Sequence, residues 1–325
     1  MIRRHALGFL VAASAVLAVP VAAQTGAPRL EIESRFWPNL HQFLYLLSQS
    51  ELGLVPADRA PVHAVREDMA RVVELSDEER AGWERAVAHY RENVARLSIW
   101  EDLAEVNSLL ALTPDAASPK LPRAGLADAL AAGAPAYRRL WWPRHQASNA
   151  RWIAEQQAVR RQHGDAVASR LSRMFRTDWP ATLVPVQIVA HATMFGAYQQ
   201  DVPPMLHLSS LYAGHAGTLG FEQLYHEAGH VIDDGVFNAL RAEAQRQAKT
   251  AGLQRWVDLA HAMLFYTAGD AVRRALPSHV PYAEAEGVWR RAPRNRQLLD
   301  SHWQPYLDGE IGFEEAIRRL VAAIE

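Results

Sequence analysis

Two histidines and a glutamate stand within five residues of one another in the segment His226-Glu227-Ala228-Gly229-His230. On a helix, side chains four residues apart project from the same face, so both imidazoles can bind one Zn²⁺ ion. Glu227 lies beside them, rotated by roughly a third of a turn or less. Its carboxylate can take a proton from a water whose pKa the metal lowers to about 7. The spacing therefore predicts a zinc site with its own general base.

The residues around this segment are uncharged, as expected for a helix buried beneath an active site. Leu224 and Tyr225 precede the first histidine, and Val231 and Ile232 follow the second. An exposed amphipathic helix normally carries charges over such a stretch. This context favours a functional site over a chance occurrence of the pattern.

Catalytic zinc usually has three protein ligands, and the segment supplies two. The next expected helix, near residues 257–274, contains no Glu but does contain His261. We expect His261 to be buried and to be the third ligand, with Asp258 one turn earlier orienting its ring. Four carboxylates remain as alternative ligands: Asp258, Asp270, Glu284 and Glu286.

Three more side chains are candidates for supporting roles. Asp234 lies one turn beyond His230 and could fix the tautomer of that imidazole. Tyr266 and Tyr282 are candidates to donate a hydrogen bond to a developing oxyanion. His191, His207 and His215 precede the motif and could line its cleft, although each alone is better interpreted as structural.

The segment resembles the signature helix of the zincin metallopeptidases, in which two histidines bind zinc and the glutamate is the general base. The resemblance implies Zn²⁺ as cofactor, His226 and His230 as ligands, Glu227 as base, and a peptide or protein as substrate. It also implies an edge strand upstream of the helix that aligns the substrate. Either Leu183–Val189 or Leu206–Ser209 would be that strand.

The clan within this superfamily is open. Asp233 and Val236 stand where metzincins carry a glycine and a third histidine, which excludes that clan. The chain is closer to gluzincins but has no obvious glutamate as third ligand. The resemblance covers only the motif helix.

The hydrophobic periodicity predicts a predominantly helical chain with a small sheet. Helical stripes run through residues 36–47 and 83–97, with Ser76 and Glu79 as a capping box, and a long helix covers residues 152–175. The segment 113–125 is proline-rich and is a candidate linker. Strands are expected at the two segments named above, and Pro185 implies that the first lies at an edge or carries a bulge. One helix from about 218 to 248, another from 253 to 275, and two short helices near 295–307 and 313–324 complete the expected pattern.

Arg3 and Arg4 precede an apolar run that ends in Val21-Ala22-Ala23, the pattern of a secretory signal peptide covering residues 1–23. Export to the periplasm or the exterior is expected, with no stable membrane insertion after cleavage. The chain has no cysteine, so histidines and carboxylates must hold any metal. The net charge of −2 gives no reason to expect nucleic acid as a partner.

Together these features predict an α+β, predominantly α-helical fold: a helical region over residues 24–179 and a zincin-like core with a small edge-stranded sheet over residues 180–325. One continuous domain over residues 24–325 is the alternative organisation. The expected function is that of an exported zinc-dependent hydrolase, most simply a metallopeptidase. Two rival interpretations are a zincin-like binding or structural protein without turnover, and a helical interaction module without metal.

Overall fold

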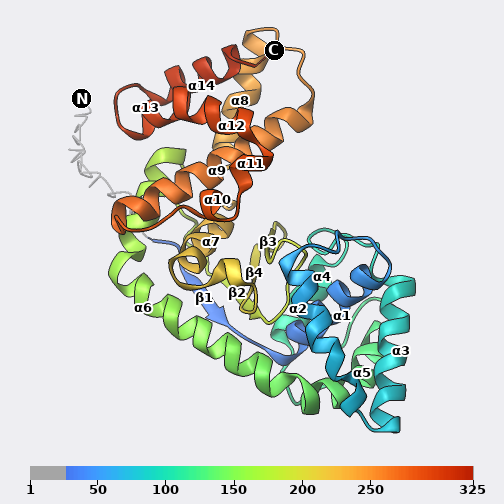
Figure 1. The fold of residues 1–325 in the computed structure, drawn as a ribbon. Helices are drawn as coiled ribbons and strands as arrows, with labels where there is room; N and C mark the ends of the chain where they lie inside the picture. Colours follow the sequence, from blue (N-terminus) through green and yellow to red (C-terminus); the bar gives the residue numbers. More distant parts are fainter. Residues whose placement is uncertain (1–26, 325) are drawn as a thin grey trace, which may run out of the picture.

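A computed structural model describes residues 27–324 of the chain (Figure 1). The expected signal peptide over residues 1–23 therefore lies outside the described residues. The fold is α+β and predominantly helical, with one small four-stranded sheet, as the sequence predicted. Two hydrophobic cores underlie two lobes. The sheet belongs mainly to the second core, and a long helix runs past both. No helix in this part of the chain has the length and apolar character needed to cross a membrane.

The N-terminal lobe is a helical assembly around an aromatic-rich core. The expected stripes form α1 and α3, and the expected capping box opens α3, with Ser76 Oγ accepting from the Glu79 backbone N–H at 3.3 Å. The proline-rich segment 113–125 connects α4 to α5 within this lobe, so it is a loop and does not separate domains. The helices are α1 (Phe36–Glu51), α2 (Ala60–Met69), α3 (Asp77–Asn93), α4 (Ala104–Leu112) and α5 (Leu126–Leu140), with a 3₁₀ turn at Ala70–Glu74.

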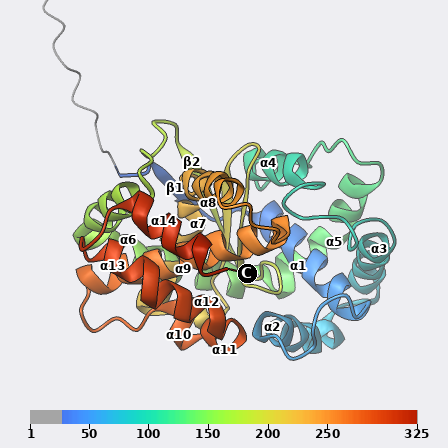
Figure 2. The same ribbon diagram turned by 90° about the horizontal axis from the view of Figure 1, so that it is seen from above.

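Helix α6 (Trp142–Phe175) begins ten residues before the predicted start and links the two lobes (Figures 1 and 2). Its first residue packs in the N-terminal core, whereas Trp152 and the residues beyond it pack in the second core. The boundary between cores therefore falls along α6 and not at the predicted position near residue 180. No sequence pattern indicates this boundary, because the helix is continuous through it.

The sheet comprises β1 (Leu30–Glu33), β2 (Val184–Val189), β3 (Ala197–Gln200) and β4 (Met205–Ser209) in the order β1-β2-β4-β3. The first three strands of this order run parallel, and β3 pairs antiparallel with β4 at the edge. The prediction that Pro185 places its strand at an edge is wrong, since β2 lies between β1 and β4. Pairing with β4 begins only at Val186, so the missing N–H of Pro185 costs no bond on that side.

The C-terminal lobe carries the motif helix and the helices that cover it. A single helix over 218–248 was predicted, but the chain turns at residues 230–233 and forms two, α7 (Gly217–Gly229) and α8 (Asp234–Arg246). Helix α9 (Leu253–Ala275) packs against α7 so closely that a Cβ on Gly229 would lie 2.5 Å from Leu264 Cδ1. The remaining helices are α10 (Tyr282–Ala285), α11 (Val288–Arg291), α12 (Pro293–Leu298), a π turn at Leu299–Trp303, α13 (Gln304–Leu307) and α14 (Phe313–Ala322).

A candidate metal centre in the cleft between the lobes

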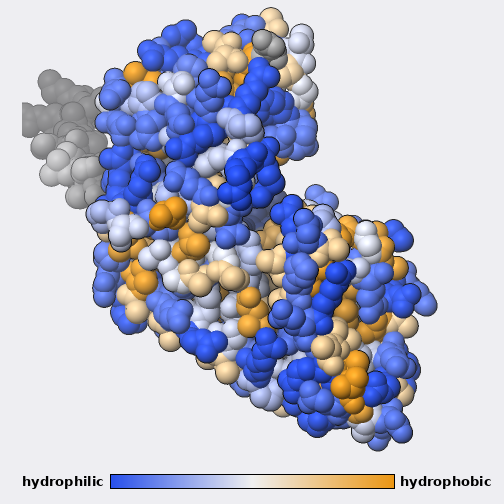
Figure 3. Space-filling view, viewed as in Figure 1, coloured by the Kyte–Doolittle hydropathy of each residue, from blue (hydrophilic) through white to orange (hydrophobic). Residues whose placement is uncertain are grey.

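A cleft of about 1300 Å³ lies between the two lobes and contains the motif. The surface is visibly hollowed there in the space-filling view (Figure 3). One wall comes from the C-terminal lobe, where α7, α8 and α9 contribute side chains. The other wall comes from the N-terminal lobe and from β3. His226, Glu227, His230 and His261 all line this space.

Three histidines, which we call the open histidine cluster, meet at the wall of the cleft: His226, His230 and His261. One ring nitrogen from each lies within 4.8 Å of the others. Helix α7 supplies the first two at the predicted four-residue spacing, and α9 supplies the third. The structure thus brings together the three histidines that the sequence predicted as ligands, from two helices packed side by side.

Asp233 orients His230. Its Oδ2 accepts a hydrogen bond from His230 Nδ1 at 3.1 Å, which leaves Nε2 free to face the cluster. Burial alone would lower the pKa of His230, but this bond and the charge of Glu227 raise it. The prediction gave the orienting role to Asp234, which makes no hydrogen bond among the described side chains. The prediction assumed that the helix continues to Asp234, but α7 ends at Gly229. Asp233, in the turn that follows, therefore brings its carboxylate to the His230 ring.

His261 differs from expectation in two respects. It is exposed to the cleft and not buried, although its Nε2 lies 3.3 Å from Nε2 of the buried His226. Asp258 does not orient it, because that carboxylate accepts from Gln254 Nε2 at 2.8 Å. Desolvation and the repulsion of His230 lower the pKa of His261 to about 4, so its ring is neutral at pH 7.

The donor set fits a zinc ion. Two nitrogens bound to one tetrahedral Zn²⁺ at 2.0–2.1 Å lie about 3.3 Å apart, the separation found between His226 and His261. Burial and the neighbouring imidazoles hold the pKa of His226 well below its usual range, so this ring too is neutral and can offer a lone pair. Phe265 stacks on His226 with ring centroids 3.8 Å apart and fixes the ring plane. One departure is that His226 Nδ1 has no partner among the described residues.

Glu227 is buried at the floor of the cleft, with 5% of its surface exposed. Burial raises the pKa of its carboxyl group, while His230 and Gln223 oppose the rise. Gln223, one turn earlier on α7, donates from Nε2 to Glu227 Oε1 at 2.9 Å and fixes the carboxylate. A carboxylate held in place with a raised pKa suits proton transfer. No role was predicted for Gln223, although its four-residue spacing from Glu227 places both side chains on the same face of a helix.

Tyr282 lines the same cleft, as predicted, whereas Tyr266 does not. The Tyr282 ring stacks parallel to Phe265 at 5.9 Å, and its backbone N–H donates to the buried Glu222 Oε2 at 2.7 Å. His279 shares that carboxylate at 2.5 Å. Burial raises the pKa of Tyr282 well above its usual range, so its hydroxyl stays a donor.

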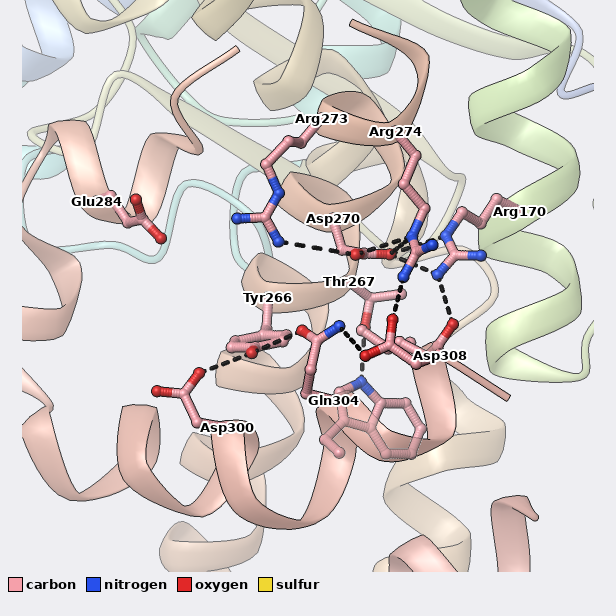
Figure 4. A network of polar contacts seen from close by, with 12 residues as sticks. Arg170, Tyr266, Thr267, Asp270, Arg273, Arg274, Glu284, Asp300, Gln304 and Asp308 are labelled. Atoms are coloured by element: carbon pink, nitrogen blue, oxygen red, sulfur yellow. Dashed lines mark hydrogen bonds and ion pairs between the residues drawn. The ribbon is translucent and has the colours of Figure 1, made fainter. Parts of the chain in front are cut away.

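Tyr266 points to the other side of α9, where it donates to Asp300 Oδ1 at 2.7 Å (Figure 4). It therefore cannot serve as an oxyanion donor in the cleft. The same figure shows Asp270 held by arginines, with Arg170 Nη2 at 2.6 Å, so this alternative metal ligand is also excluded from the cluster. Glu284 pairs with Arg296 at 3.0 Å outside the cleft. Glu286 lines the cleft but accepts from the Tyr212 hydroxyl.

A second group, which we call the closed histidine cluster, comprises Asp68, His145 and His191 and is fully buried in the N-terminal lobe. Asp68 Oδ2 accepts from His145 Nε2 at 2.8 Å and from His191 Nε2 at 2.6 Å. Its other oxygen pairs with Arg144. Although burial would raise it, these bonds hold the pKa of Asp68 well below its usual range. The carboxylate is already satisfied, and a guanidinium lies beside it.

The other upstream histidines do not reach the cleft. His207 is buried and stacks on Tyr198 with ring centroids 4.6 Å apart. His215 is also buried, and its Nδ1 lies 3.0 Å from Ser209 O. Both fit the structural role that sequence analysis preferred for them.

The strand that borders the cleft is β3, which the sequence did not reveal as a strand. Ala197, Tyr198 and Gln199 line the cleft beside the motif helix. Neither of the two predicted candidates is an edge strand, since β2 and β4 are both paired on two sides. The segment Ala197–Gln200 is short, with two glutamines, and carries little hydrophobic alternation to detect.

No family model matches the chain, and no curated protein or solved structure matches it.

Proposed function

We propose that this chain is a zinc-dependent hydrolase that cleaves peptide bonds. The observation that carries the proposal is the open histidine cluster beside the buried, oriented Glu227 at the floor of a cleft of about 1300 Å³. The resemblance to the zincin signature helix supports the same function. So does the position of an antiparallel edge strand, β3, along the cleft next to α7.

His226, His230 and His261 would hold the metal. Bound there, Zn²⁺ would supply a Lewis acid that polarises a peptide carbonyl and makes a water more acidic. Glu227 accepts the proton of the attacking water and delivers it to the departing amine nitrogen, and its raised pKa makes the carboxylate a better acceptor in the first transfer. Gln223 keeps the carboxylate aimed during both steps.

Two further elements act on the substrate. The Tyr282 hydroxyl can donate to the carbonyl oxygen as negative charge develops on it, with Glu222 holding its backbone in place. The outer edge of β3 offers unpaired backbone groups to an extended polypeptide. Such an edge binds the main chain of a polypeptide. It can therefore hold a peptide substrate of any sequence, without a protein side chain that recognises one particular residue.

Glu227→Gln tests the proposal. We expect this variant to keep the zinc affinity of the wild type and to lose hydrolysis of fluorescently labelled, unfolded casein by about 10²-fold or more, because the carboxylate is base and not ligand. Glu284→Gln, whose carboxylate pairs with Arg296 outside the cleft, is the matched control and should cleave normally. Near-normal cleavage by Glu227→Gln would contradict the mechanism.

We also propose that the protein is exported and acts in the periplasm or outside the cell, since its first residues have the pattern of a secretory signal. N-terminal sequencing of exported material should find a chain that begins near Gln24. Exported material that begins at Met1 would overturn this part of the proposal.

A further inference from the structure

The wall of the cleft that faces the histidines carries two exposed aromatic side chains. Trp100 is 42% exposed and Phe195 is 48% exposed, and both line the cleft. Among the large hydrophobic side chains that are exposed over residues 27–324, these are the aromatic ones, and the rest are leucines and valines. Val257 on α9 adds a 41% exposed apolar side chain to the lining of the cleft. Exposed apolar side chains that gather in one concave surface indicate a binding site, whereas single ones scattered over a protein surface do not.

These aromatic side chains adjoin the edge strand β3. Phe195 comes two residues before the strand, and the Trp100 ring lies 6.3 Å from the ring of Tyr198 on the strand itself. Trp100 therefore lies on the face of the sheet to which Tyr198 points. Arg59 approaches the Phe195 ring at 5.7 Å from its centroid and leaves the ring partly open to the cleft.

The register of β3 shows which of its backbone groups point away from β4. Ser209 N–H donates to Gly196 O at 2.8 Å, so Gly196 and Ser209 form a hydrogen-bonded pair. Such pairs alternate along an antiparallel ladder, so the N–H and C=O groups of Ala197 and Gln199 point away from β4. The Ala197 carbonyl accepts a long hydrogen bond of 3.5 Å from the Thr193 hydroxyl, which an incoming N–H would have to replace. A polypeptide that binds there adds a strand to the sheet, and its side chains alternate between the two faces. Every second side chain would then point to the Tyr198 face, where Trp100 lies.

We infer that the cleft selects extended polypeptide segments that carry bulky apolar side chains at alternate positions, with Trp100 and Phe195 forming the pocket that receives one of them. The inference rests on the proposed function only for the position of the polypeptide along β3. The pocket itself requires no metal. It gives the protein a preference for unfolded or exposed hydrophobic segments over polar ones.

The experiment uses two fluorescently labelled dodecapeptides, one with phenylalanine at alternate positions and a twin with serine at those positions. Fluorescence anisotropy with excess chelator measures binding to the signal-free chain without turnover. We expect the phenylalanine peptide to bind at least about tenfold more tightly, and Trp100→Ala and Phe195→Ala each to reduce that preference by roughly three- to tenfold. Leu112→Ala removes a side chain that is 78% exposed outside the cleft and should leave the preference unchanged.

Equal binding of the two peptides would overturn the inference, as would an undiminished preference in both Trp100→Ala and Phe195→Ala. Thermal melts of the variants check that both fold, and two independent substitutions keep the test decisive. The outcomes also separate this inference from the proposed function. A preference that Trp100→Ala and Phe195→Ala reduce, found in a protein that cleaves nothing when zinc is added, would support the pocket and contradict the hydrolase. Cleavage without the preference would contradict the pocket alone.

Discussion

The molecule holds two clusters of histidines, and they are built on opposite principles. In the closed histidine cluster an anion lies at the centre, so each imidazole donates a proton to Asp68 and the charges balance with Arg144. In the open histidine cluster no anion lies between the rings, and two Nε2 atoms face each other at 3.3 Å. Asp233 binds from behind, on Nδ1 of His230. Two facing ring nitrogens can share one proton or, when both are deprotonated, direct their lone pairs at one cation.

Distance separates the clusters as well. The nitrogen–oxygen separations of 2.6 and 2.8 Å in the closed cluster are those of charge-assisted hydrogen bonds, whereas 3.3 Å suits two ligands of one zinc ion. Burial differs too, since His261 opens onto the cleft and His145 does not. The closed cluster therefore stabilises the N-terminal lobe, whereas the open cluster faces the cleft.

The largest effect should come from His261→Ala. Removing one of three ligands should weaken zinc affinity by about three orders of magnitude or more, because two histidines on one helix hold the ion poorly. Helix content measured by circular dichroism should not change, since the ring is exposed to the cleft. Competition with a chromophoric chelator measures the affinity. Full zinc occupancy in the variant would show that another residue completes the site.

Asp68→Ala should destabilise the fold without touching the metal. It leaves two buried imidazoles and the Arg144 guanidinium without their acceptor, which should lower the free energy of unfolding by about 3–5 kcal/mol. Urea denaturation measures the loss, and Glu67→Ala, an exposed neighbour on α2, should change stability by less than about 0.5 kcal/mol. A drop in zinc affinity in Asp68→Ala that exceeds what the lost stability explains would break the contrast.

Asp233→Asn and Asp234→Asn form a matched pair on neighbouring residues. Only Asp233 contacts His230, so Asp233→Asn should reduce zinc affinity by about 10–100-fold and Asp234→Asn should not. The same chelator competition measures both. Equal effects of the two substitutions would mean that the zinc affinity depends on the negative charge near the site and not on the orientation of the His230 ring.

The smallest effect concerns acid. Burial lowers the pKa of His145 from 6.5 to about 4, so the unfolded chain binds a proton more readily than the folded one between those values. The stability linked to His145 is therefore complete above about pH 6.5 and falls as the pH drops toward 4. With chelator present, the fall in unfolding free energy between pH 7.5 and 5.5 should be about 1 kcal/mol smaller in His145→Gln than in wild type. Identical falls in the two proteins would show that His145 keeps an ordinary pKa in the fold.

The sequence predicted the elements that depend on strong local patterns. Helix α9 begins and ends where its periodicity does, and the Ser76 capping box is present as the residue types required. The three histidines were predicted because ligand spacing on a helix is local and because successive helices pack together. What failed depends on tertiary packing. The end of α7 at Gly229, where Leu264 leaves no room for a Cβ, decided that Asp233 and not Asp234 meets His230. Strand β3 exists because β4 offers it a partner, and no pattern in its four residues shows that.

Metal content tests the central claim most directly. Purified protein dialysed against zinc and then against buffer should carry one zinc ion per chain by elemental analysis, as a single three-histidine site requires. His226→Ala and His230→Ala should carry none, whereas His145→Gln and His191→Gln should keep the full amount. A wild-type protein that carries no zinc would contradict the account. So would loss of zinc in His145→Gln and His191→Gln together with full zinc content in His226→Ala and His230→Ala.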